Sequence, residues 1–311
     1  MTTVPFSVYD AFSDVAFGGS QGGIVLDAGD VDAGQRLQIA KELGLPAICF
    51  VSALSDTSIA ARFQSTEREY PMCGHGTICL MTHLLELGLL SWNGRDEFDV
   101  ELDLSTNKAR VEVHRRSDDR ALVMLDIKPP TFRSSSVDLE IMAGLLGITV
   151  SDYHHDLPIE TAMGDFVHLV VPVKDLTVMQ AIAANFSGIT QYCREQGIET
   201  VACFSTQTQQ PDHTIHVRDF CPAVGVPESA AAGTTNAALT SYLIRHGVVQ
   251  PDEDGHISVK AEQGLEIRRP SSIASRVVIK DGAIARLQIG GVASKVFEGQ
   301  LHLPMGGVVD E

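Results

Sequence analysis

The sequence predicts an α+β protein made of two similar halves. Its strand-like segments are too numerous and too closely spaced for a doubly wound parallel sheet, which would place a helix between successive strands. Two segments of about thirty residues also repeat one design. Between them, Pro129 and Pro130 precede the polar run at 133–136, a composition typical of a linker.

In the first half, alternating or continuous apolar runs predict the strands, and AGQRLQIAKEL at 33–43 predicts an amphipathic helix that ends at Gly44. The expected strands are 6–8, 22–26, 48–51, 59–64, 98–104, 109–114 and 122–127. In the second half we expect helices at 175–184 and within 233–245. Its expected strands are 167–173, 201–205, 215–220, 257–261, 266–268, 275–279 and 285–289.

The repeated design is an Arg-containing strand, a turn of small residues and a helix that stops at a glycine. The copies read ARFQ…YPMCGHGTICLMTHLLELG and VRDF…ESAAAGTTNAALTSYLIRHG. Cys73 stands fifteen residues before Gly88, and Ala232 stands fifteen before Gly247. The spacing predicts two equivalent halves, each with one helix N-terminus, and pairs Cys73 with Ala232.

Composition narrows the classes of partner. The net charge of −17 arises from 40 acidic and 23 basic side chains, without a basic patch, which argues against nucleic acid and anionic membranes. The N-terminus lacks a signal-peptide pattern and no apolar run spans a bilayer, so we expect a cytoplasmic protein. Six cysteines without a C-x-x-C indicate neither a disulfide framework nor a zinc site.

Two helix starts suit the binding of a small carboxylate, because their free N–H groups and partial positive charge stabilise an anion. The same groups can stabilise the charge that develops when a proton leaves the carbon beside a carboxylate, with no metal and no cofactor. No P-loop, dinucleotide turn or metalloprotease motif competes with this interpretation. The expected substrate-binding residues are Gly74, Gly76, Thr77, Gly233, Thr234, Thr235 and Asn236.

Cys73 is the expected base, since a thiol in the first turn of a helix has a depressed pKa and can become a thiolate. His75 is the expected proton donor or shuttle. The structural alternatives are a buried Cys73 and a capping or hydrogen-bonded His75.

Glu228 and Thr234 are possible acid–base groups of the second helix start. Glu228 could instead favour the helix dipole, and Thr234 could cap the helix. The other histidines, including His154 and His155, are interpreted as surface or structural residues because they lack metal-ligand company.

The chain resembles the phenazine-biosynthesis isomerase family over nearly its whole length. The resemblance rests on VYDAF…GGSQGGIVLDA, on P-x-x-G-H-x-T at 71–77, on R-D-F-C-P at 218–222 and on the closing Q-G…R-P-S at 263–271. The stretch MCGHGTI at 72–78 also resembles the thiol-base motif of proline racemases and hydroxyproline epimerases.

The resemblance implies a diaminopimelate epimerase-like fold, in which each half is a curved, mostly antiparallel sheet around a central helix. Residues 1–129 and a returning segment near 300–311 would form one half, and 130–299 the other, with the active site between them. A homodimer is implied as well.

The departures from the family pattern shape the expected reaction. The family's catalytic glutamate falls on Ala47, its aspartate on Ser229, and the second racemase thiol on Ala232. One thiol and one imidazole remain, which favours a one-base 1,3-proton shift that moves a double bond in a small carboxylic acid. Dehydration of a small hydroxy acid and two-base epimerisation are the alternatives, and a non-catalytic binding protein is the alternative of another class.

Overall fold

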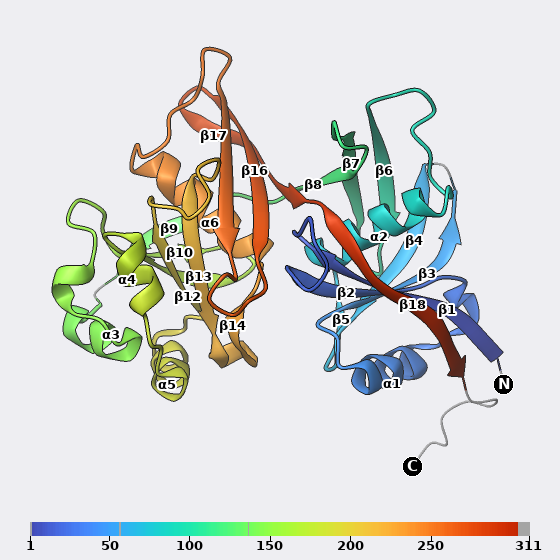
Figure 1. Cartoon of the computed structure of the whole chain (residues 1–311), viewed down its shortest axis with the longest axis horizontal. Helices are drawn as coiled ribbons and strands as arrows, with labels where there is room; N and C mark the ends of the chain where they lie inside the picture. The colour runs from blue at the N-terminus through green and yellow to red at the C-terminus, as the bar shows by residue number, and fades with distance from the viewer. Residues whose placement is uncertain (1, 56, 136, 304–311) are drawn as a thin grey trace. The chain divides into compact units, whose positions relative to one another are not determined.

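The computed structural model describes residues 2–55, 57–135 and 137–303 (Figure 1). The chain divides into unit 1, Met1–Leu125 with Gly290–Glu311, and unit 2, Asp126–Ile289. The chain leaves unit 1 for unit 2 after Leu125 and returns to unit 1 at Gly290, whereas the sequence predicts these passages at residue 129 and near residue 300. The return comes early because strand β18 (Ala293–Leu303) pairs with β1 (Thr2–Ala11) along its whole length.

Unit 1 is a mostly antiparallel sheet around one helix, α2 (Gly74–Glu86). Strand β1 pairs antiparallel with β18 and β2; the pairs β3–β4, β6–β7 and β7–β8 are antiparallel; β2–β3 and β4–β6 are parallel. The further strands are β2 (Ser20–Val25), β3 (Ile48–Leu54), β4 (Ser58–Gln64), β5 (Glu69–Tyr70), β6 (Glu97–Asp103), β7 (Lys108–Arg115) and β8 (Ala121–Asp126), with helix α1 (Ala33–Leu43) and a 3-10 turn at Ala28–Asp30.

Helix α2 is central because it is apolar around nearly its whole circumference. Every residue from Gly76 to Leu84 is buried, as expected for a helix enclosed on all sides. At Gly22 of β2, an added Cβ would lie 2.8 Å from Cys79 Sγ, so only glycine allows this strand to approach the helix so closely.

Unit 2 repeats this arrangement around α6 (Gly233–Arg245). Antiparallel pairs join β9–β10, β10–β11, β12–β13, β13–β14 and β15–β16, and parallel pairs join β11–β12 and β13–β15. The strands are β9 (Thr131–Ser134), β10 (Glu160–Met163), β11 (Val167–Pro172), β12 (Thr200–Ser205), β13 (Ile215–Cys221), β14 (Val226–Ser229), β15 (His256–Gln263), β16 (Ser271–Lys280) and β17 (Ala283–Gly291). The smaller helices are α3 (Leu139–Leu146), α4 (Leu176–Ala181) and α5 (Phe186–Gln196), with 3-10 turns at Val150–Asp152 and Pro222–Val224.

The central helices α2 and α6 are equivalent in detail. Both contain 13 residues, and their N-cap residues have nearly the same backbone angles: φ −140°, ψ 107° at Cys73 and φ −136°, ψ 115° at Ala232. Each is followed by a glycine with positive φ, +69° at Gly88 and +67° at Gly247. Neither N-cap side chain accepts a hydrogen bond from its helix.

Some predicted elements are wrong. Residues 266–268 form a turn, because the Arg269 amide bonds to the Gly264 carbonyl and Arg268 has φ +59°. The helix expected at 175–184 ends at Ala181, since the amides of Ala183 and Asn185 bond to α3 carbonyls instead. Helices α3 and α5 were not predicted.

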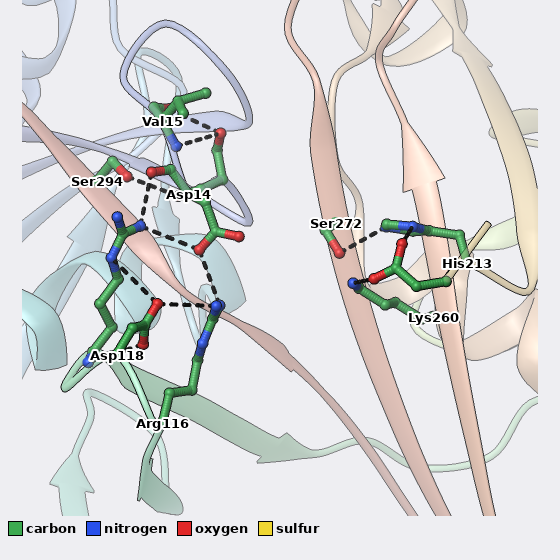
Figure 2. Close-up of polar contacts among 11 residues, drawn as sticks. Asp14, Val15, Arg116, Asp118, His213, Lys260, Ser272 and Ser294 are labelled. Carbon is green, nitrogen blue, oxygen red and sulfur yellow. Dashed lines mark hydrogen bonds and ion pairs between the residues drawn. The ribbon is translucent and has the colours of Figure 1, made fainter. Parts of the chain in front are cut away.

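Two polar clusters fix surface loops within the separate units (Figure 2). In unit 1, Arg116 and Arg120 both donate to Asp14, which anchors the loop between β1 and β2. In unit 2, His213 lies between Asp212 and Ser272, and Lys260 pairs with Asp212.

The close packing at the start of α2 predicts a difference between its two glycines. A Cβ at Gly76 would lie 2.9 Å from the Phe63 ring and 3.2 Å from Cys73 Sγ, whereas the nearest atom at Gly74 would be 3.8 Å away. Gly76→Ala should therefore lower the free energy of unfolding by about 1–3 kcal/mol, as overpacked cores do. The control Gly74→Ala should be neutral or slightly stabilising. Urea unfolding measures both, and equal stability of the two variants would contradict the packing argument.

Candidate active site

Cys73 and His75 form a close pair at the start of α2. Cys73 Sγ lies 3.5 Å from His75 Nδ1 and 3.6 Å from His75 Nε2, so either ring nitrogen can face the thiol. Cys73 is 6% exposed and His75 is half-buried. Because Cys73 provides no cap, the first helical amides have no side-chain acceptor at this position.

Burial determines the protonation of this pair. It raises the pKa of Cys73 to about 12, although the Gly76 backbone amide acts in the opposite direction. It also lowers the pKa of His75 to about 4. The depressed thiol pKa expected from the helix start is therefore wrong for the resting protein: at neutral pH both groups are uncharged.

The neighbouring predicted residues have different roles. Thr77 is fully buried, and its hydroxyl and amide donate to the Cys73 carbonyl at 2.8 and 2.9 Å. This contact holds the N-cap residue and uses the one proton that the Thr77 hydroxyl can donate. Gly76 is needed for packing, while Gly74 is sterically open.

At the start of α6, the hydroxyl of Thr235 and the side-chain nitrogen of Asn236 donate hydrogen bonds within the unit, while Asn236 Oδ1 is buried without a partner among the described residues. The Thr235 hydroxyl donates to Asp219 at 2.8 Å. The Asn236 amide donates at 2.9 Å to both the Ala232 carbonyl and Gln263 Oε1, in the same position that Thr77 occupies in unit 1. Gly233 and Thr234 stay half-buried at the helix start.

The closing Q-G…R-P-S motif holds the turn that precedes α6. Gln263 donates to the Ser229 carbonyl at 2.8 Å, and Ser271 donates to the Ala230 carbonyl. Gly264 has φ +77°, and a Cβ there would lie 2.7 Å from the Ala230 oxygen, so a side chain would push the turn away. The motif therefore fixes the helix start of unit 2.

Glu228 forms a buried ion pair with Arg218. Its two carboxylate oxygens accept hydrogen bonds from Arg218 Nε and Nη2 at 2.9 and 2.8 Å, and both side chains are buried. Arg218 also donates to the carbonyls of Met179 and Ile182. The ion pair is a structural role of Glu228 beside the two considered from the sequence, acid–base catalysis and a favourable charge at the helix dipole.

The positions of the missing family acids offer no carboxylate. Ala47 is fully buried and its carbonyl accepts the Gly23 amide at 2.9 Å. Ser229 pairs with Asp219 in the β13–β14 ladder.

A buried polar cluster beside α6 was not predicted from the sequence. His168 Nδ1 lies 2.8 Å from Thr200 Oγ1, and the Thr235 hydroxyl donates to the carboxylate of Asp219 at 2.8 Å. The sequence predicts His168 to be a surface or structural residue, because it lacks metal-ligand company. The available signal was Asp219 within R-D-F-C-P: alternation along β13 sends Arg218 toward α4 and Asp219 toward α6.

Among the described residues, no group of three or more His, Cys, Asp or Glu side chains is arranged to hold a metal ion. In the same part of the chain, no helix has the length and apolar character required to cross a bilayer.

Two halves, each with an enclosed helix and a mostly antiparallel sheet, define the diaminopimelate epimerase-like class of α+β folds, as predicted. A structure of a phenazine biosynthesis protein from Bacillus anthracis has the same fold, with a TM-score of 0.87 and 24% identity over 97% of this chain and all of the other. A hydroxyproline epimerase from Agrobacterium vitis gives a TM-score of 0.59 at 12% identity, covering 96% and 92% of the two chains.

The chain belongs to the phenazine biosynthesis-like protein family, whose model matches residues 9–299. It is 25% identical over 294 residues to an uncharacterized isomerase of Escherichia coli, YddE, covering 94% of this chain and 96% of that protein. It is also 25% identical over 287 residues to the trans-2,3-dihydro-3-hydroxyanthranilate isomerase of Pseudomonas chlororaphis, covering 92% and 95%. The relatives' names place the chain among isomerases.

The buried ion pair predicts that Glu228→Gln affects stability more than chemistry. Removing one partner leaves the Arg218 charge buried and unpaired, which typically costs about 3–5 kcal/mol. The control Glu101→Gln breaks the exposed pair with Lys108 and should cost less than about 1 kcal/mol. Denaturation midpoints test both variants. A stable Glu228→Gln protein without activity would restore the acid–base role.

Proposed function

We propose that this protein is a metal- and cofactor-independent isomerase that moves a proton between carbons of a small carboxylic acid, with Cys73 as the base. The observation that carries the proposal is the Cys73–His75 pair, with 3.5 Å between Sγ and Nδ1, at a helix start that no side chain caps. The family's isomerase names support the reaction class.

The helix start suits the substrate's charge. A carboxylate can accept hydrogen bonds from the uncapped amides of the first turn, where the helix dipole also favours an anion. When a proton leaves the adjacent carbon, the electron pair moves onto the carboxylate oxygens. The same donors then stabilise the added negative charge without rearranging.

The neutral resting pair can still supply a base. If the thiol proton passes to His75, a thiolate and an imidazolium form together. The attraction between their opposite charges lowers the free-energy cost of burying them, whereas a lone ion in the same surroundings lacks this stabilisation. The thiolate removes the substrate proton, the double bond shifts, and a proton returns to the third carbon from sulfur or imidazolium. No proton is gained or lost overall.

A double-bond shift agrees best with a single thiol. The paired position in unit 2 is Ala232, which can neither accept nor donate a proton, whereas interconversion of two enantiomers ordinarily uses a group on each face. The Pseudomonas chlororaphis relative is named for an isomerisation, so trans-2,3-dihydro-3-hydroxyanthranilate belongs in the panel of substrates to be tried. Dehydration and epimerisation are other outcomes of the same assay.

The pKa directions predict an unusual pH profile. Proton transfer within the pair should make kcat/KM nearly constant from about pH 5.5 to 8.5, because His75, with a pKa of about 4, stays neutral and able to accept. Activity should fall as pH approaches 4. In His75→Asn the thiol, with a pKa of about 12, must ionise alone, so the rate should rise about tenfold per pH unit. Cys73→Ala should lower kcat/KM about 10²–10⁴-fold throughout this pH range. A wild-type profile that climbs tenfold per unit would instead mean that free thiolate is the base.

Isotope transfer tests the single base. With a substrate deuterated at the abstracted carbon, part of the label should appear at the new carbon in ordinary water, as NMR of the product would show. Ala232→Cys should leave the native reaction largely intact, since the paired position has no part in it. A native activity that interconverts stereoisomers at one carbon would refute the double-bond shift.

A further inference from the structure

His216 lies between two carboxylates in the interior of unit 2. Its Nδ1 atom is 2.7 Å from Glu262 Oε1, and its Nε2 atom is 2.9 Å from Glu266 Oε1. The side chains of His216 and Glu262 are fully buried, and that of Glu266 is 14% exposed. A neutral imidazole carries one N–H group, so it would donate to one carboxylate and turn a lone pair toward the other. The geometry therefore suits the imidazolium, which donates to both.

The two carboxylates are held unequally. Glu262 accepts hydrogen bonds from the Gln209 and Gln210 amides at 2.6 and 2.9 Å, one at each oxygen. Glu266 Oε2 is buried and has no hydrogen-bond partner among the described residues. Burial alone would lower the pKa of His216, but its hydrogen bonds to Glu266 and Glu262 outweigh burial and raise the pKa. The same contact lowers the pKa of Glu266 although burial acts in the opposite direction.

The other charged groups near His216 leave its role to it alone. Arg218 projects from the same face of β13 and is close enough to lower the pKa of Glu266. Its guanidinium is already bonded to Glu228 through Nε and Nη2, and to two carbonyls at the end of α4 through Nη1. On the other side, β12 places the uncharged Ser205 opposite His216. The imidazolium is thus the cation that holds Glu266.

Glu266 lies in the middle of the turn at 264–270, which joins β15 to β16. Gly264 has φ +77° and Arg268 has φ +59°, so both lie in the left-handed region. For Arg268, which has a side chain, this conformation is strained and persists only where the surrounding structure holds it. The hydrogen bond from His216 to Glu266 joins this turn to β13.

Both ends of the turn contact the segment that leads into α6. Before the turn, Gln263 donates to the Ser229 carbonyl, and after it Ser271 donates to the Ala230 carbonyl. A Cβ at Gly264 would lie 2.7 Å from the Ala230 oxygen, so the turn also packs directly against this segment. A movement of the turn would therefore displace the start of α6.

We propose that protonated His216 is a positioning residue for the start of α6: it binds the turn at 264–270 through Glu266, and release of its proton to solvent as pH rises frees the turn. The functional part rests on the proposed isomerase, in which the α6 start binds part of a small carboxylate. Below the raised pKa of His216 both hydrogen bonds are complete, and one is lost as pH rises through that pKa. Glu266 is released because Glu262 keeps its two amide donors.

Nitrogen-15 NMR of the histidine-labelled whole protein tests the protonation without a substrate. At pH 7.5, where a free histidine is mostly neutral, we expect both ring nitrogens of His216 to carry protons. His213 is the internal control, because it is also bonded at both nitrogens, to Asp212 and Ser272 (Figure 2). Burial lowers the pKa of His213, and the Ser272 hydroxyl can donate, so a neutral ring satisfies both contacts. A singly protonated His216 at this pH would overturn the proposal.

Hydrogen exchange of the Arg268 and Arg269 amides, which bond within the turn, tests whether the proton holds it. Between pH 7 and 10, their protection factors in the wild type should fall about tenfold or more as His216 titrates. The Arg116 amide of unit 1, bonded to the Arg120 carbonyl, should stay constant. Protection of the turn that does not follow the His216 titration would overturn the proposal.

Two variants of the half-buried Glu266 sharpen this measurement. Glu266→Gln keeps the size of the side chain and can donate from its amide to a neutral His216, so the turn should stay protected at every pH. Glu266→Ala removes the contact, so protection should be low at every pH. The exposed control Glu253→Gln should behave as the wild type. Wild-type behaviour of Glu266→Ala would also overturn the proposal.

Kinetics test the functional part separately. On a substrate that Cys73→Ala no longer converts, the wild-type KM should rise about three- to tenfold as His216 loses its proton, with little change in kcat, as for one weakened hydrogen bond. Glu266→Gln should remove this pH dependence. A KM that stays constant while the turn opens would overturn the link to α6 and leave the isomerase intact. Full activity of Cys73→Ala would reject Cys73 as the base, while NMR and hydrogen exchange would still decide the role of His216.

Discussion

The uncapped start of a buried helix is the constraint on which both units depend. Most helices begin at a residue whose side-chain oxygen accepts one of the free amides, but Cys73 and Ala232 supply no such acceptor. In each case the residue four positions later, Thr77 or Asn236, bonds to the carbonyl of the N-cap residue and so fixes the first turn. The first turn is thus held by a side chain of the same helix, while its amides lack a side-chain cap and are available to an anion.

This constraint explains several residues that carry no chemistry themselves. Gly22 lets β2 approach α2 at Cys79, and Gly76 lets Phe63 pack against the helix start beside Cys73, which is 6% exposed. Gln263, Gly264 and Ser271 hold the corresponding turn in unit 2. Burial also raises the pKa of Cys73, so the thiol does not readily ionise by itself. Its reactivity therefore depends on the imidazole of His75 beside it.

The fold could be predicted from the sequence because the repeat consists of local sequence patterns. Gly88 and Gly247 end helices of equal length, and the small-residue turns mark their starts. The ends of elements that depend on tertiary contacts were harder to predict from the sequence. The carbonyls of Leu145 and Leu146 in α3 accept hydrogen bonds from the amides that would have extended α4, and no local sequence pattern predicts this contact.

The site was predictable to the same extent. Cys73 and His75 are two residues apart on one turn, so their proximity follows from the chain itself. The sequence does not predict the ion pair of Glu228, because its partner lies across a strand pair and ten residues of sequence do not reveal that Arg218 is buried beside it. His168 and Asp219 are separated by 51 positions, and only the β11–β12–β13 register brings them to the same side of the sheet.

The equivalence of the helices makes their chemical difference informative. The nearly equal backbone angles at the two N-caps show that the helix starts in the same way at a cysteine and at an alanine. The difference lies in the side chains: Cys73 and His75 lie at the helix start of unit 1, whereas the corresponding N-cap residue of unit 2 is Ala232. The fold thus accommodates a titratable side chain at one helix start and an apolar side chain at the other, without a difference in the length of the two helices.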